Sequence, residues 1–261
     1  MIHRNVRRMS AILTGFACAL ALPRLAAQVT ESPVTVAPGS LRVEMDGLRL
    51  SLDREDGAGA TYNALAVAST FVSAGLAEGL DVQIGADLFL RERVVYRGAR
   101  DSSSGLGDLS LRMKWKVWQD AKLGAALAVM PYVKIPSGSG SVGSDAVEGG
   151  VIVPWAAGLP GGIVSGAMFR WDVVRNDDEN GYDSRWLATG YLQRHLTRSL
   201  AFYGEATVQA ASTGASNTAG TIGVGALLQV TRRLQLDYEL QRGVNRRAAE
   251  WTHVLRVNWD W

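Results

Sequence analysis

The sequence has one cysteine, three histidines and seven prolines in 261 residues. A single cysteine excludes a disulfide framework, a four-cysteine zinc site and an iron–sulfur cluster. So few histidines leave little for metal or acid–base chemistry, and we predict neither a metal site nor a cofactor. Charged residues make up 20% of the chain, below the quarter usual in soluble proteins, while glycine is abundant at 29 residues.

A helical membrane span is also missing beyond the amino terminus. The two longest stretches without a charge, residues 57–77 and 149–169, are rich in small residues or interrupted by proline and glycine. Neither contains the ~20 dense apolar residues that a spanning helix needs. We therefore expect no helical bundle in an inner membrane.

The amino terminus has the pattern of a secretory signal over residues 1–27. Three arginines among the first eight residues precede the apolar run Ala11–Leu22, and small residues follow at Ala26 and Ala27. Twelve apolar residues are too few for a membrane anchor. Cleavage would remove Cys18 and four arginines, leaving 23 basic against 25 acidic residues, so the mature net charge would be −2. We expect no nucleic-acid partner from that balance.

Alternation of apolar and polar residues, which is typical of strands, fills the rest of the chain. The last segment is the clearest case, because aromatic and aliphatic residues recur on one face from Trp251 to Trp261. We predict twelve strands, at 41–52, 61–75, 80–92, 106–118, 122–135, 146–158, 162–174, 183–195, 200–211, 219–230, 234–243 and 250–261. They match or exceed the ~9–11 residues that a tilted membrane strand requires.

The connections between these strands alternate in length. Short ones such as Leu76–Gly79 and Thr231–Arg233 alternate with longer polar or glycine-rich ones such as Arg93–Gly105 and Pro136–Asp145. Outer-membrane barrels show this pattern, with short periplasmic turns and longer outer loops. The predicted fold is therefore an all-β, transmembrane antiparallel barrel of about 12 strands.

Three segments follow from this pattern: a signal peptide at 1–27, a short periplasmic segment at 28–40 and a barrel at 41–261. At 13 residues, the segment 28–40 is too short to form a plug domain. We expect the outer membrane of a Gram-negative-type cell, with both termini periplasmic. The C-terminal strand Trp251–Trp261 resembles the signal that barrel-assembly machinery recognises, so we expect that machinery and the lipid bilayer as partners.

Charged residues fall on the face opposite the aliphatic ones. A charge facing lipid at the midplane costs ~2–4 kcal/mol, so these residues should face the lumen. The predicted lumen-lining set, which is also the predicted solute path, is Asp108, Arg112, Lys114, Lys134, Glu148, Arg170, Asp172, Glu205, Asp237 and Arg256. The outward-facing set is Leu109, Leu111, Leu234, Leu236, Leu255 and Val257.

One pair within the lumen set lies at the predicted mouth. Lys134 and Glu148 end two adjacent strands that are joined by the Gly/Ser-rich loop Pro136–Asp145. We predict that these two side chains face each other across the hairpin and that the loop folds inward. Lys134 should then affect solute passage more than barrel stability.

Two interpretations of the lumen stay open. Twelve strands lie between side-chain-filled barrels of eight and open channels of 16–18 strands. The barrel is either a passage for small solutes or a non-conducting structural or adhesion-type barrel with a packed polar lumen. An enzyme is not predicted, because only His195 and His253 remain after cleavage and no Gly-x-Ser-x-Gly motif is present.

Several blocks in the second half of the chain resemble a known family. They are Gly105-Leu106-Gly107-Asp108, Lys114 with Lys116, the run Pro131–Gly138, Glu148-Gly149-Gly150 and Gln235-Leu236-Asp237. From Gly105 onward the chain resembles outer-membrane transporters linked to meta-pathway phenol degradation. The resemblance implies passive uptake of aromatic or other hydrophobic solutes. The segment Arg242–Arg247 departs from the family pattern, which bears on the solute and not on the barrel.

Overall fold

The computed structural model describes residues 30–54, 60–139, 142–176, 181–212 and 218–261. The predicted signal peptide lies outside these residues. Thirteen strands are present: β1 (Leu41–Leu52), β2 (Ala60–Ala77), β3 (Leu80–Tyr96), β4 (Ala99–Gly105), β5 (Leu109–Asp120), β6 (Ala125–Ile135), β7 (Glu148–Leu159), β8 (Ile163–Arg175), β9 (Tyr182–His195), β10 (Leu200–Ala211), β11 (Ala219–Gln229), β12 (Leu234–Gly243) and β13 (Trp251–Asp260). In the described part of the chain, no helix is long and apolar enough to cross a membrane.

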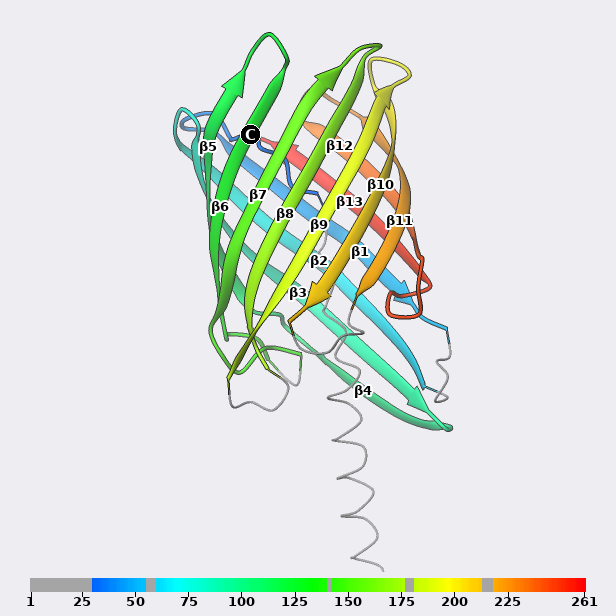
Figure 1. Cartoon of the computed structure of the whole chain (residues 1–261). Helices are drawn as coiled ribbons and strands as arrows, with labels where there is room; N and C mark the ends of the chain where they lie inside the picture. The colour runs from blue at the N-terminus through cyan, green and yellow to red at the C-terminus, as the bar shows by residue number, and fades with distance from the viewer. Residues whose placement is uncertain (1–29, 55–59, 140–141, 177–180, 213–217) are drawn as a thin grey trace, which may run out of the picture.

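The strands close into a single antiparallel barrel (Figure 1). Strands adjacent in sequence pair with each other except β4 and β5, and β1 pairs with β13 to complete the ring. Strand β3 pairs with β5 along Leu80–Gly85 and with β4 along Leu90–Tyr96. Because β4 and β5 share one side of β3 in this way, the 13 strands occupy twelve positions around the barrel. Closure satisfies the backbone groups that a free sheet edge would expose to lipid. The predicted barrel and its closure by the first and last strands are confirmed.

One predicted loop is instead a hairpin. The prediction placed a long connection at Arg93–Gly105, but β3 continues to Tyr96 and the chain returns as β4. Arg97 and Gly98 form the turn with φ values of 48° and 83°. Positive φ at both central residues suits the twist of a two-residue hairpin. The chain then leaves the ladder at residues 106–108 and rejoins it as β5.

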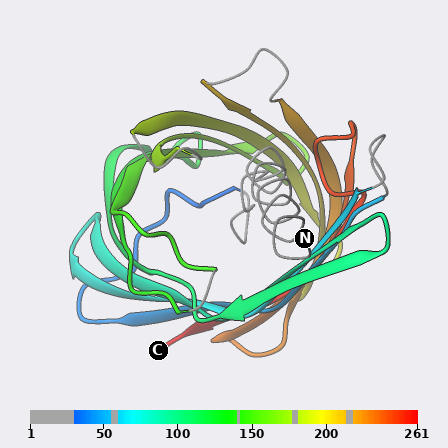
Figure 2. The same ribbon diagram turned by 90° about the horizontal axis from the view of Figure 1, so that it is seen from below.

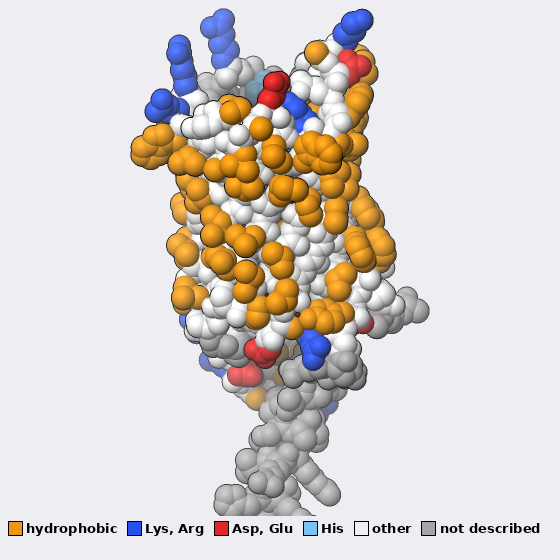
Figure 3. All heavy atoms as spheres, turned by 90° about the vertical axis from the view of Figure 1, so that its left-hand side faces the viewer, with side chains coloured by type: hydrophobic (Ala, Val, Ile, Leu, Met, Phe, Trp, Pro, Cys, Tyr) orange, Lys and Arg blue, Asp and Glu red, His pale blue; other side chains and the backbone are white. Residues whose placement is uncertain are grey.

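Apolar side chains cover the outside of the barrel. On β5, Leu111, Met113 and Trp115 are 40–57% exposed, whereas Lys114 between them is 3% exposed. Of the predicted outward-facing set, Leu111 and Leu255 are exposed, and Leu109, Leu234, Leu236 and Val257 are half-buried. Figure 3 shows the resulting band of hydrophobic side chains, with charged groups above and below it. The alternation thus separates a lipid-facing surface from an enclosed lumen.

Candidate functional site: the barrel lumen

Residues 30–40 lie inside the barrel, where Figure 2 shows them as the blue segment crossing the lumen. The Thr30 hydroxyl lies 2.5 Å from the Thr189 hydroxyl and donates a hydrogen bond to the Glu205 carboxylate at 2.5 Å. The carboxylate of Glu31 accepts a hydrogen bond from Arg112 at 2.8 Å and lies 3.9 Å from the Lys114 ammonium. This amino-terminal segment therefore occupies part of any path through the barrel.

The other end of the segment is attached to the wall near the start of β1. The Val36 N–H donates to the Asp81 carboxylate at 2.9 Å, and Pro38 forms an isolated bridge with Gly75. A Cβ on Gly75 would lie 2.0 Å from the carbonyl oxygen of Ala37. Only glycine lets the segment approach β2 this closely.

The expectation of a short periplasmic segment at 28–40 is wrong for the described residues 30–40. Thirteen residues cannot fold into a plug domain, but an extended chain needs no core of its own. Its backbone and side chains are satisfied by lumen residues that lie far away in the sequence, as between Glu31 and Arg112. Local patterns in the sequence carry no signal for such contacts.

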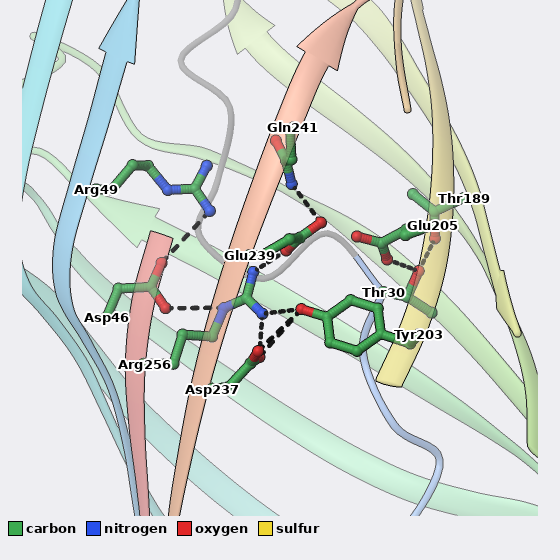
Figure 4. Close-up of polar contacts among 10 residues, drawn as sticks. All are labelled: Thr30, Asp46, Arg49, Thr189, Tyr203, Glu205, Asp237, Glu239, Gln241 and Arg256. Atoms are coloured by element: carbon green, nitrogen blue, oxygen red, sulfur yellow. Dashed lines mark hydrogen bonds and ion pairs between the residues drawn. The ribbon is translucent and has the colours of Figure 1, made fainter. Parts of the chain in front are cut away.

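One side of the lumen, which we name the charged wall, is formed by Asp46, Arg49, Asp237, Glu239 and Arg256 of β1, β12 and β13 (Figure 4). The Arg256 guanidinium reaches three carboxylates: Asp46 at 3.2 Å, Asp237 at 2.5 Å and Glu239 at 2.6 Å. Arg49 lies 3.4 Å from Asp46. Because opposite charges satisfy one another here, the wall can remain buried.

Neighbouring polar groups extend this network. Tyr203 on β10 donates to Asp237 at 3.0 Å and accepts a hydrogen bond from Arg256 at 3.2 Å. The side-chain amide of Gln241 donates to Glu239 at 2.9 Å. Asp237 and Glu239 thus each have a neutral hydrogen-bond donor besides Arg256, whereas Asp46 is held by Arg49 and Arg256.

The opposite side of the lumen, which we name the apolar wall, is formed by Met130, Ile152, Met168 and Leu187 of β6 to β9. These four side chains are at most 4% exposed and pack together with Tyr132 against them. In the circular strand order β6–β9 lie across the barrel from β1, β13 and β12. This wall was not predicted from the sequence, because only polar groups were expected inside the barrel.

A signal for the apolar wall was available. Inward-facing residues recur every second position along a strand. Counting back from Lys134 leads through Tyr132 to Met130, and counting back from Arg170 leads to Met168. Strand β6 is apolar on both faces, so it lacks the alternation that would have marked Met130 as different from its lipid-facing neighbours.

A second group of charges lies on the same strands as the apolar wall. Arg170 holds Asp172 at 2.7 Å, and the Tyr132 hydroxyl donates to the same carboxylate. The guanidinium of Arg112 lies 3.8 Å from the centre of the Phe71 ring, a cation–π contact. Aromatic and cationic groups therefore meet in this part of the lumen.

A cavity of about 50 Å³ lies between the two walls. Glu31 of the amino-terminal segment lines it together with Asp46 and Arg256 from the charged wall and Ile152 and Met168 from the apolar wall. A space of this size holds little more than a water molecule or two. With the segment in place, the lumen offers no room here for a six-membered ring.

At one mouth of the barrel, the predicted pair of Lys134 and Glu148 is confirmed, with 2.5 Å between the ammonium and the carboxylate. Lys134 also lies 3.6 Å from Asp108. The Asp108 carboxylate accepts hydrogen bonds from the Gly138 N–H at 2.9 Å and from both the N–H and the hydroxyl of Ser144, at 2.8 and 2.6 Å. The loop after β6 is thereby tied to the segment between β4 and β5.

Asp108 lies outside the strands, and its surroundings favour the charged form. Partial burial alone would raise the pKa of this carboxyl. The hydrogen bonds from Ser144 and Gly138 and the charge of Lys134 outweigh burial and hold the pKa below its ordinary value. Glycine is required at position 138, because a Cβ there would lie 2.8 Å from the Gly143 Cα and 2.9 Å from the Leu106 carbonyl oxygen. The two blocks that resemble the transporter family, 105–108 and 131–138, thus form one structural unit.

The structure brings the predicted lumen set into three groups. Asp237 and Arg256 belong to the charged wall, with Glu205 beside it; Arg112, Lys114, Arg170 and Asp172 lie near the apolar wall and Glu31; Asp108, Lys134 and Glu148 lie at the mouth. All ten are buried or half-buried. Their role as a solute path stays a prediction.

Within the part of the chain that the structure describes, His195 and His253 are not hydrogen-bonded to a serine. His195 contacts the Gln193 side chain at 3.3 Å, and His253 shares a 2.8 Å hydrogen bond with Tyr238. Among the described residues, no group of three or more histidine, cysteine or acidic side chains is arranged to hold a metal ion.

The fold resembles solved outer-membrane barrels. The COG4313 outer membrane channel from Pseudomonas putida F1 is 13% identical with a TM-score of 0.62, over 90% of this chain and 99% of that one. The translocator domain of the autotransporter NalP from Neisseria meningitidis is 14% identical with a TM-score of 0.51, over 98% and 97% of the two chains. The KdgM porin is 10% identical with a TM-score of 0.50, over 84% and 99%.

A search of curated proteins finds no match. A family model does match, and it covers residues 26–261, which include the amino-terminal segment inside the lumen. The protein therefore belongs to the family described as "Putative MetA-pathway of phenol degradation".

Proposed function

We propose that this protein is a passive outer-membrane channel for small solutes that carry an apolar, typically aromatic, part. The observation that carries the proposal is the apolar wall inside a lumen that is otherwise charged. Met130, Ile152, Met168 and Leu187 give a solute ring a surface to contact, while Arg112 and Tyr132 next to them can hydrogen-bond its polar substituents. A barrel for ions alone would have no use for such a wall.

Passage requires the amino-terminal segment to move. The cavity beside Glu31 is about 50 Å³, too small for a ring. The contacts that hold Thr30 and Glu31 in the lumen are hydrogen bonds and ion pairs, not covalent bonds. Such contacts break and re-form, so we propose that solutes pass between the two walls when residues 30 and 31 leave them.

Family membership and fold likeness both support this function. The family description refers to phenol degradation, and solved barrels of similar fold include one described as an outer membrane channel and one described as a porin. We propose the outer membrane as the location, with the start of β1 and the carboxyl terminus on the periplasmic side and with assembly machinery acting on β13. Chemistry on the solute is not part of the proposal.

The alternative is a non-conducting barrel with a packed lumen. The small cavity and the ion pairs of the charged wall favour it as long as the segment stays in place. The two functions differ in one property, because only a channel gives a current across a bilayer.

Single-channel recording with an aromatic probe tests the proposal. The mature chain is inserted into a planar bilayer, and ion current is recorded before and after addition of catechol or, as a non-aromatic control, glucose. We expect catechol to interrupt the current and glucose to have a much weaker effect. The double variant Ile152→Asn, Met168→Gln should lose the catechol effect but keep the current.

Val254→Thr provides the matched control, because Val254 is fully buried on the inner face of β13, beside the charged wall and away from the apolar wall. It should respond to catechol like the unchanged protein. If neither the unchanged protein nor a Glu31→Gln variant gives a current, the result supports the non-conducting barrel instead.

A further inference from the structure

The hairpin of β3 and β4 extends beyond the barrel wall, as Figure 1 shows at its lower right. About 9–11 residues of a tilted strand cross the apolar layer, and β3 has 17. Counted from Leu80, the crossing ends near Leu88–Leu90, and Leu88 and Phe89 are 54% and 39% exposed. The residues from Arg91 onward therefore reach the level of the lipid headgroups.

Three arginines share one face of this hairpin. Arg91 lies opposite Ser104, Arg93 opposite Ser102 and Val95 opposite Arg100. Opposite residues in an antiparallel pair point to the same side, as do residues two apart on a strand. Arg91 and Arg93 are thus neighbours along β3, and Arg100 is the diagonal neighbour of Arg93 at roughly 7–8 Å.

No acid balances these three charges. The acids of the hairpin, Glu92 and Asp101, lie on its other face, where Glu92 pairs with Ser103 and Val94 with Asp101. On the adjacent β2, the partners of Arg91 and Arg93 are Leu65 and Asn63. Within the described residues, none of the three guanidiniums forms an ion pair.

The face also offers hydroxyl groups, because Ser102 and Ser104 alternate with the arginines across the hairpin. Guanidinium groups that bind in a bidentate manner, supplemented by hydroxyl donors, are the usual partners of phosphate. Clustered like charges repel, and a bound phosphate would relieve that repulsion. The chemistry of this face therefore fits a phosphorylated ligand.

The ligand is not expected to be a solute on its way through the lumen. Among the described residues, the buried charged groups comprise seven acids and three bases. A positive funnel at the mouth would lead anions into an acidic interior.

We propose that the face formed by Arg91, Arg93 and Arg100 binds the phosphate groups of the outer-leaflet glycolipid, lipopolysaccharide. Basic residues at this level gain from the negative surface of the membrane. Bound lipid would fix the hairpin against the outer leaflet and stabilise β3 at the point where its partner changes from β5 to β4. The inference rests on the proposed outer-membrane location but not on solute transport.

Binding of lipid A to the folded mature chain in detergent micelles tests the inference, with native mass spectrometry as the readout. The triple variant Arg91→Gln, Arg93→Gln, Arg100→Gln should lower the affinity by roughly tenfold to a hundredfold. Dephosphorylated lipid A should bind the unchanged protein as weakly as lipid A binds the variant. Inorganic phosphate at equal concentration should not displace lipid A, which distinguishes a lipid site from a free phosphate site.

The matched control removes three exposed arginines from the opposite rim, Arg198→Gln, Arg232→Gln and Arg233→Gln. It has the same net charge as the hairpin variant and should bind lipid A like the unchanged protein. Equal loss in both triple variants, or undiminished binding by the hairpin variant, would overturn the inference. Heat-modifiable gel mobility verifies folding, and Arg100→Gln alone replaces the triple variant if it does not fold.

Bilayer current separates this inference from the proposed function. Loss of lipid A binding with normal current in the hairpin variant supports both proposals. Unchanged lipid A binding in that variant contradicts the inference alone. Absence of current from every variant contradicts the proposed function alone.

Discussion

The charged wall and the apolar wall face each other across the lumen, yet different forces hold their side chains. Arg256 on the charged wall contacts three carboxylates within 3.2 Å. Met130 and Ile152 on the apolar wall are held by packing contacts, which are individually weak and tolerate rearrangement. The charged wall is therefore the rigid side of the lumen, and the apolar wall is the side that can adapt to a solute.

This difference also explains where the amino-terminal segment lies. Glu31 binds Arg112 and Lys114, which belong to neither wall, and its N–H points to the Met168 sulfur at 3.4 Å. The arginines of the charged wall are already occupied by their own acids. The segment is thus held by cations that remain available, next to the adaptable side of the lumen.

The largest expected effect is the loss of the cation at the centre of the charged wall. Arg256→Met leaves the carboxylates of Asp46, Asp237 and Glu239 buried without their main partner. We expect a loss of about 3–5 kcal/mol in the free energy of unfolding. Urea unfolding in lipid vesicles measures it. The exposed Arg233→Met is the control and should change stability by less than about 0.5 kcal/mol. Similar losses in both variants would show that the charged wall is not the rigid element.

The apolar wall should tolerate truncation better than the charged wall tolerates charge loss. Met130→Ala removes a fully buried side chain, and we expect it to cost about 2–3 kcal/mol in the free energy of unfolding, the lower part of the range for such changes. Met113→Ala removes the same side chain from the lipid-facing surface, where it is 40% exposed, and should cost less. The same unfolding experiment compares them. A larger loss for Met113→Ala would place the packing that matters outside the barrel.

The mouth should respond to acid. Asp108 has a pKa held below its ordinary value of 3.8, so its charged form stabilises the folded mouth at higher pH. That contribution is complete above the ordinary pKa and is lost as the pH falls through the lowered one. We expect Asp108→Asn to melt at a lower temperature than the unchanged protein at pH 6, and the difference to shrink toward pH 2. A difference independent of pH would assign the effect to shape and not to charge.

The smallest expected effect on stability comes from Lys134→Ala. Its ion pair with Glu148 joins cross-strand neighbours, a contact worth ~0.2–1 kcal/mol. Ion selectivity of the bilayer current should change more than stability, because a positive charge at the mouth is removed. Unchanged current and selectivity in a folded variant would remove Lys134 from the solute path.

The barrel could be predicted from the sequence because membrane strands alternate strictly. Strand β10 begins and ends at the predicted residues Leu200 and Ala211, and the pair of Lys134 and Glu148 followed from the same alternation. The β3–β4 hairpin was missed although Arg97-Gly98 is a suitable turn. Its serine-rich return strand lacks the apolar alternation that marks the other strands.

Contacts between distant residues could not be predicted. Thr30 meets Thr189 and Glu205 through side chains that are 159 and 175 positions away. Only the closed barrel brings these residues together, and no local period encodes them. The apolar wall is an intermediate case. It was not predicted, but its residues could have been found by counting every second position along the strands from the assigned inward-facing residues.

The central claim is that solutes pass only when the amino-terminal segment leaves the lumen. A reversible disulfide between this segment and the barrel wall tests that claim most directly. The Thr30 and Thr189 hydroxyl oxygens are 2.5 Å apart, and the sole cysteine, Cys18, lies in the predicted signal peptide. We predict that the double variant Thr30→Cys, Thr189→Cys conducts poorly when oxidised and recovers its current and catechol response on reduction, whereas Thr30→Cys alone does not respond to reductant. Equal current and equal catechol response in the oxidised and reduced double variant would contradict the account.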